Sequence, residues 1–79
     1  MALRCIAKDP ESKTGASPTV WVDEATGDVL LQGWMVDEAV LEECRGTGPI
    51  PDSEFVVRLP ARLAGALREA ADVAERAAG

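Results

Sequence analysis

The sequence predicts a small α+β domain, in which an antiparallel sheet of three or four strands carries one long C-terminal helix packed on one face, with a short helix between strands. Three observations predict it. Two β-rich runs lie within Pro18 to Val36 and flank a glycine-containing turn, a third run alternates over Glu54 to Leu59, and a helical apolar pattern covers Ala61 to Ala78. With 79 residues, the chain has the size of one domain, so we assign residues 1–79 to a single globular unit.

The first elements are a strand, a polar loop and a hairpin. Ala2 to Ala7 is short and apolar, which favours a strand, whereas Lys8 to Ser17 is polar and contains Pro10 and Gly15. In the hairpin, Gly27 supplies the positive φ that closes the turn. If Asp23 faces Asp28, the register pairs Val22 with Val29, Trp21 with Leu30, and Val20 with Leu31. Gly33 indicates a bulge or the close approach of another backbone.

The run from Pro18 to Val36 is apolar on both faces, although a small sheet normally buries only one. One alternating set is Val20, Val22, Val29, Leu31 and Met35; the other is Trp21, Leu30, Trp34 and Val36. We expect the C-terminal helix to cover the aliphatic set with its Leu63, Leu67 and Val73 side. The second set then needs cover from self-association or from a protein partner.

The second half of the chain predicts a helix, a strand and a helix. Asp37 caps a short helix that ends at Cys44, because an aspartate accepts hydrogen bonds from the first free amides. A turn-rich connection follows, from Arg45 to Ser53. In the strand Glu54 to Leu59, we expect Phe55, Val57 and Leu59 on one side. Pro60 then opens the C-terminal helix.

Composition narrows the function classes. The net charge of −6 disfavours nucleic acid and anionic membranes as partners, because both attract basic surfaces, and it suits a basic protein partner. The chain has no His, the most common metal ligand and acid–base catalyst. We therefore predict no catalytic, cofactor or metal site, and no enzyme activity.

The N-terminus lacks a signal-peptide core, so we expect a cytoplasmic protein with Cys5 and Cys44 reduced. The sequence leaves a disulfide between them as the alternative.

The candidate partner-binding residues combine the second apolar set with the acids that follow it: Trp21, Leu30, Trp34, Val36, Asp37 and Glu38. Trp is enriched at binding hot spots because it buries a large area at little entropic cost. The alternative is that both tryptophans belong to the core, and the sequence does not decide between the two.

The stretch EFVVRLPARLAGALREAADVA, from Glu54 to Ala74, resembles the start of ribbon–helix–helix repressors and antitoxins. The resemblance implies a DNA-reading strand with Glu54, Val56 and Arg58 on its reading face. Only one cation lies on that face, and no second helix follows before Gly79.

Most of the chain also resembles small actinobacterial proteins encoded beside helix–turn–helix regulators. The resemblance is carried by Cys5, by QGWMVD (Gln32 to Asp37) and by IPDSEFVVRLP (Ile50 to Pro60). It implies an accessory or antitoxin-like role, with a transcriptional regulator as one possible partner. We therefore expect a non-enzymatic protein–protein interaction module, which can also be a homodimer; the alternative is a DNA-binding repressor of the ribbon–helix–helix type.

Overall fold

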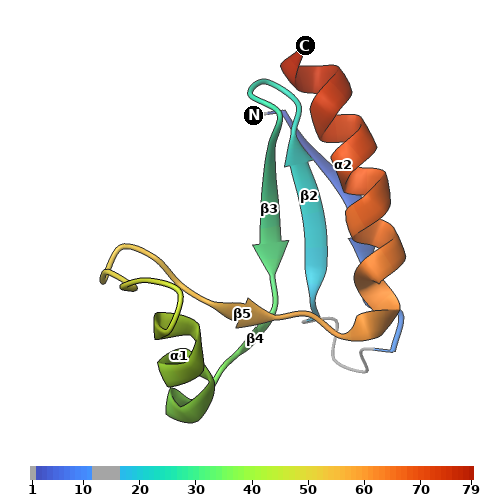
Figure 1. The fold of residues 1–79 in the computed structure, drawn as a ribbon. Helices are drawn as coiled ribbons and strands as arrows, with labels where there is room; N and C mark the ends of the chain where they lie inside the picture. Colours follow the sequence, from blue (N-terminus) through green and yellow to red (C-terminus); the bar gives the residue numbers. More distant parts are fainter. Residues whose placement is uncertain (1, 12–16) are drawn as a thin grey trace.

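The computed structural model describes residues 2–11 and 17–79, and it confirms the α+β class. A three-stranded antiparallel sheet has the order β1-β2-β3, formed by Leu3–Lys8, Thr19–Asp23 and Asp28–Gln32. A 3-10 turn, η1 (Ala61–Leu63), leads into the long C-terminal helix α2 (Ala64–Ala78), which lies along one face of this sheet (Figure 1). We call β1, β2, β3, η1 and α2 together the sheet lobe.

The hairpin between β2 and β3 has the predicted register. Asp23 pairs with Asp28, and the next three pairs are Val22 with Val29, Trp21 with Leu30 and Val20 with Leu31. Gly27 has a φ of 84°, and its N–H donates to the Asp23 carbonyl at 2.8 Å. The turn therefore needs a glycine at this position, since few other residues adopt positive φ without strain. Half of the loop predicted for Lys8 to Ser17, residues 12–16, lies outside the described residues.

The core lies between β2 and α2. Val20 and Val22 are 0% exposed and pack against the helix residues Ala70, Val73 and Ala74. The alanines let the helix approach the sheet closely, and Leu63 is buried at its start. Leu67, which was expected on the packed side, is exposed instead. Its position on the helical wheel places it at the edge of the buried stripe.

The hairpin does not extend to Val36, although the alternating apolar pattern of Pro18 to Val36 predicted that it would. Strand β3 ends at Gln32, and the next strand, β4 (Trp34–Met35), pairs antiparallel with β5 (Val57–Arg58) in a separate two-stranded sheet. Gly33 lies at the break, where an added Cβ would come within 2.6 Å of the Arg58 carbonyl oxygen. This close approach is one of the two roles predicted for Gly33.

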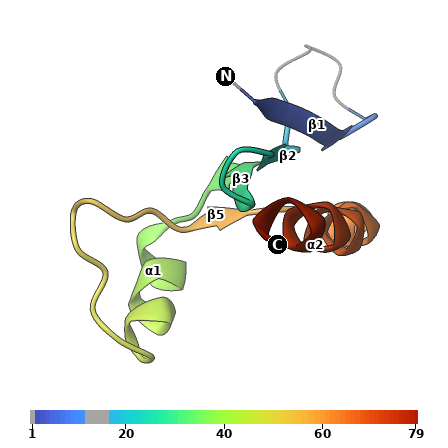
Figure 2. The same cartoon turned by 90° about the horizontal axis from the view of Figure 1, so that it is seen from above.

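Residues 34–58 form a projection that we call the arm. It contains β4, the short helix α1 (Glu38–Arg45), a long connection and β5. Figure 2 shows α1 and the connection that follows it standing to one side of the sheet and α2, with β5 leading back to α2. The radius of gyration is 13.9 Å, whereas a compact domain of this length has about 11.6 Å. The arm therefore makes the molecule more extended than a compact domain.

The predicted strand from Glu54 to Leu59 is mostly absent, because only Val57 and Arg58 are in β5. Leu59 packs against the core. Phe55, expected on the same side of the strand as Leu59, is 87% exposed. Phe55 lies in the arm, before the chain reaches β5. Strand alternation therefore does not determine whether its side chain is buried.

Candidate interaction surface

The arm contains the short helix α1, whose residues are all exposed or half-buried. The Asp37 side chain caps α1 by accepting the Val40 N–H at 3.0 Å, as the sequence predicted. At the other end, Arg45 donates to Glu38 at 2.8 Å and to Glu42 at 3.0 Å. The hydrogen bond to Glu38 is the largest cause that raises the pKa of Arg45, and the one to Glu42 is the second. No residue of α1 is buried, so local capping and ion pairing contribute to the helix where a core does not.

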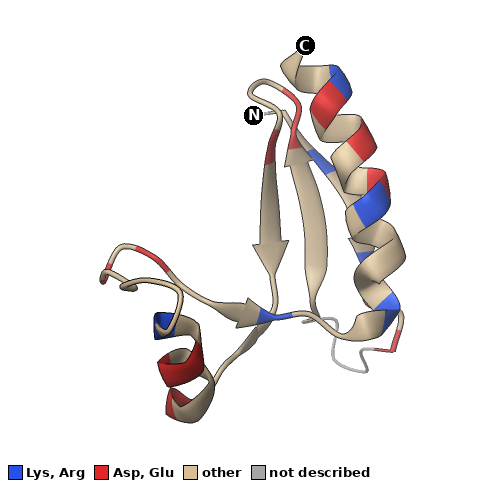
Figure 3. Ribbon diagram, viewed as in Figure 1, with Lys and Arg blue, Asp and Glu red and all other residues tan. Residues whose placement is uncertain are grey.

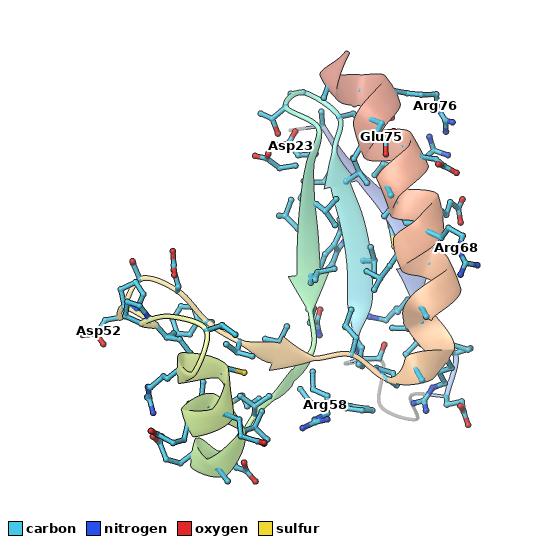
Figure 4. All side chains as sticks on the ribbon, viewed as in Figure 1. Asp23, Asp52, Arg58, Arg68, Glu75 and Arg76 are labelled. Carbon is cyan, nitrogen blue, oxygen red and sulfur yellow. The ribbon has the colours of Figure 1, made fainter. Side chains whose placement is uncertain are left out.

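An apolar hollow lies in the arm, with a volume of ≈ 460 Å³. It is bounded by β4, α1, the connection and β5. Its lining is Met35, Val36, Leu41, Arg45, Ile50, Pro51, Asp52, Glu54, Phe55, Val56 and Val57. Asp52 is at the outer end of the arm in Figure 4.

Two large apolar side chains at the hollow are almost fully exposed. Met35 is 93% exposed and Phe55 is 87% exposed. Single exposed apolar residues are common, but a group of them beside a hollow marks an interaction site more often than a neutral surface. Both side chains are also well suited to binding, since phenylalanine buries a large area and the flexible methionine adapts to irregular surfaces.

The total exposed surface supports the same interpretation. The molecule exposes 5672 Å², whereas a folded monomer of 8.3 kDa typically exposes about 4,600 Å². The excess of roughly 1,100 Å² is close to the area that one partner contributes to a standard protein–protein interface, about 800 Å². The chain therefore has enough uncovered surface for one such interface.

Trp34 stands where the arm joins the sheet lobe. Its ring is 46% exposed and lies 5.9 Å from the Arg62 guanidinium carbon, within the range of a cation–π contact. Arg62 in turn donates to both carboxylate oxygens of Asp9, at 2.8 and 2.6 Å. The Asp9 side chain is only 2% exposed. This contact chain fixes the base of the arm to the start of α2 and to the segment after β1.

The contact between Asp9 and Arg62 shifts the pKa of both side chains. The hydrogen bond from Arg62 is the largest cause that lowers the pKa of Asp9, and burial of the carboxylate opposes it. The same hydrogen bond raises the pKa of Arg62. Both groups therefore stay charged over a wider pH range than they would alone.

The six residues predicted from sequence do not form one surface. Trp21 is half-buried and pairs with Cys5 and Leu30, on the face of the sheet opposite Val20 and Val22. Trp34 instead contacts Arg62 beside the start of α2. Of the others, Val36 lines the hollow, Asp37 caps α1, and Glu38 pairs with Arg45.

Sequence reasoning missed Met35, Ile50 and Phe55 as surface residues of the hollow. Alternation placed Met35 in the aliphatic set, and it placed Phe55 on one strand face with Val57 and Leu59. One signal was present: the prolines at 49 and 51 and the turn-rich run before Glu54 indicate chain outside a sheet. For a residue just after such a run, alternation does not predict which side its side chain faces.

Both cysteines are free thiols. Cys5 is exposed on β1, and Cys44 is half-buried in α1. Among residues 2–11 and 17–79, no cluster of three or more His, Cys, Asp or Glu side chains is placed to hold a metal ion. In the same described part of the chain, no helix has the length and hydropathy that a membrane span requires.

Comparisons of the chain with protein-family models, with curated proteins and with solved structures found no match.

Proposed function

We propose that this chain is a non-enzymatic protein–protein interaction module, with a regulatory accessory or antitoxin-like role, and that the arm is its interface. The observation that carries the proposal is the exposure of Met35 and Phe55 beside a largely apolar hollow. The uncovered area adds support, because it exceeds that of a compact monomer by roughly the amount that one interface partner buries.

The proposed place of action is the cytoplasm. The supporting observation is that Cys5 and Cys44 are both free, which suits a compartment that keeps thiols reduced.

A DNA-binding role has less support. The strand that would read DNA is reduced to Val57 and Arg58, and one of its edges is paired with β4 of the same chain. Glu54 and Val56 lie outside the strand. The net charge of −6 also opposes phosphate binding. A gel-shift titration tests this role directly: strong, salt-dependent binding that is lost in Arg58→Ala would favour the DNA-binding alternative.

The interaction function is tested by comparing three forms of the full chain as bait in cells that encode it. These are the wild type, Phe55→Asp in the arm, and, as a control outside the arm, the milder Leu67→Ser on α2, where the leucine is 39% exposed. We expect a reproducible partner with the wild type and the control, and its loss with Phe55→Asp. Circular dichroism checks that all three fold. Identical capture by all three forms would contradict the proposal.

A further inference from the structure

The acidic charge of the molecule is concentrated in the arm. Residues 34–58 contain six acidic and two basic residues and carry a net charge of −4, out of −6 for the whole chain. Figure 3 shows acidic residues on α1 and on the connection that follows it. The arm therefore combines the most exposed large apolar side chains with most of the net negative charge.

The charges that line the hollow are not balanced. Its lining contains one cation, Arg45, and two acids, Asp52 and Glu54. Arg45 already pairs with Glu38 and Glu42, so it is held toward α1. Within the described residues, the ion pairs closer than 4.0 Å include neither Asp52 nor Glu54. An incoming chain that carries cations would neutralise these two carboxylates.

We propose that the arm binds a basic amphipathic helix of a partner protein, which carries apolar side chains on one side and Lys or Arg beside them. The apolar side chains enter the hollow against Met35 and Phe55, and the cations lie against Asp52 and Glu54. This inference rests on the proposed function and specifies the chemistry of the partner. Apolar burial supplies most of the affinity, while the complementary charges select the partner and speed the encounter.

A second copy of the chain fits the arm less well. It would bring another arm with a net charge of −4 and a total charge of −6 to an acidic surface. Like charges at an interface cost affinity and slow association. The most basic helix of the chain, α2, also carries Glu69, Asp72 and Glu75 among its arginines, so it is not a cationic ligand.

The test uses the full chain and a fluorescent helical peptide of about 14 residues made of Leu and Lys in an amphipathic pattern. Two further peptides isolate its features: one has Glu in place of Lys, and one has Ser in place of Leu. We expect saturable binding of the Leu/Lys peptide by fluorescence anisotropy, and at least about tenfold weaker binding of the other two. Its affinity should fall several-fold between about 50 and about 500 mM salt, since added ions screen the charge contribution.

Two arm variants separate the apolar and the charged contributions. Phe55→Ser should weaken binding of the Leu/Lys peptide by about tenfold or more, with the salt dependence kept. The double variant Asp52→Asn with Glu54→Gln should weaken it about three- to tenfold and flatten the salt dependence. The matched controls on α2, Leu67→Ser and the double variant Glu69→Gln with Asp72→Asn, should bind within about twofold of the wild type.

Three outcomes would overturn the inference. They are no saturable binding of the Leu/Lys peptide, equal binding of the Leu/Glu peptide, and equal weakening by the arm and the α2 variants. Sedimentation of the chain alone supplies a fourth: self-association abolished by Phe55→Ser would make a second copy the occupant. If the peptide fails while a partner in cells still depends on Phe55, the basic-helix inference is wrong and the interaction function stands.

Discussion

The sheet lobe and the arm are built from neighbouring stretches of one chain, yet they bury their apolar side chains to very different extents. In the sheet lobe, Val20 and Val22 are fully enclosed beneath α2. In the arm, no residue of α1 is buried, and Met35 is almost fully exposed. Stability therefore comes mainly from the sheet lobe, and the arm keeps its most exposed apolar side chains in water.

The difference follows from how much covering surface each region has. Strand β2 is the central strand of its sheet and lies beneath a helix of 15 residues. The arm has an eight-residue helix and two strands of two residues each. A helix this short is marginal without packing, and a two-stranded ribbon is marginal too. Structure in the arm therefore depends on its attachment to the sheet lobe, through Gly33 and the Trp34–Arg62 contact.

The largest expected difference between the regions is in the cost of removing apolar volume. Val22→Ala leaves a cavity between β2 and α2 and should lower the free energy of unfolding by about 2–3 kcal/mol. Val36→Ala in the arm should cost less than about 1 kcal/mol, because Val36 is only half-buried. Urea denaturation followed by circular dichroism measures both. Equal losses would mean that the arm has a core of its own.

Substitution of two glycines, one at the junction and one in α2, compares how tightly the chain is packed at the two places. Gly33→Ala places a methyl group against the Arg58 carbonyl and the Val57 side chain, which should cost about 1–3 kcal/mol through overpacking. Gly65→Ala in α2 meets open space and should be neutral or stabilise by up to about 1 kcal/mol. Thermal denaturation of the two variants measures this. A Gly33→Ala protein as stable as the Gly65→Ala protein would show that β4 and β5 separate freely.

The Asp9–Arg62 contact predicts a pH dependence. The folded-state pKa of Asp9 lies below its ordinary value of 3.8. Its contribution to stability is therefore fully present above about pH 3.8 and is lost as the pH falls through the lower folded value. The stability gap between the wild type and Asp9→Asn should shrink below that pH.

Urea midpoints at about pH 7 and at about pH 2.5 test this prediction. Asp72→Asn, an exposed helix position, serves as the control and should lie close to the wild type at both pH values. A gap between the wild type and Asp9→Asn that stays constant down to the lower pH would contradict the assignment.

The smallest effect on stability is expected at the exposed apolar residues of the arm. Met35→Ser and Phe55→Ser should each change the free energy of unfolding by less than about 0.5 kcal/mol, because both side chains are already in water. The same substitutions should impair partner binding. A large loss of stability in either variant would show that the residue supports the fold rather than an interface.

The sequence predicted the hairpin, the capped short helix and the C-terminal helix because each depends on local rules. Turn chemistry at Gly27, capping at Asp37 and the helical stripe through Val73 act within a few residues. The hairpin register followed from them, since the turn fixes which residues face each other. The same reasoning failed at Met35 and Phe55, where strand alternation was extended past the point at which the strands end.

By itself, the sequence determined the α+β class, the acidic character and an excess of apolar surface relative to the helix available to cover it. Only the tertiary structure decided where that excess lies. Gly33 alone indicated a bulge or a close approach, but only the fold shows that the approaching backbone is the one at Arg58. The two most exposed large apolar side chains, Met35 and Phe55, lie at the hollow in the arm. Three apolar residues on β3 also stay partly uncovered: Val29, Leu30 and Leu31. The sequence could not locate them, because exposure depends on packing between segments that are distant in sequence.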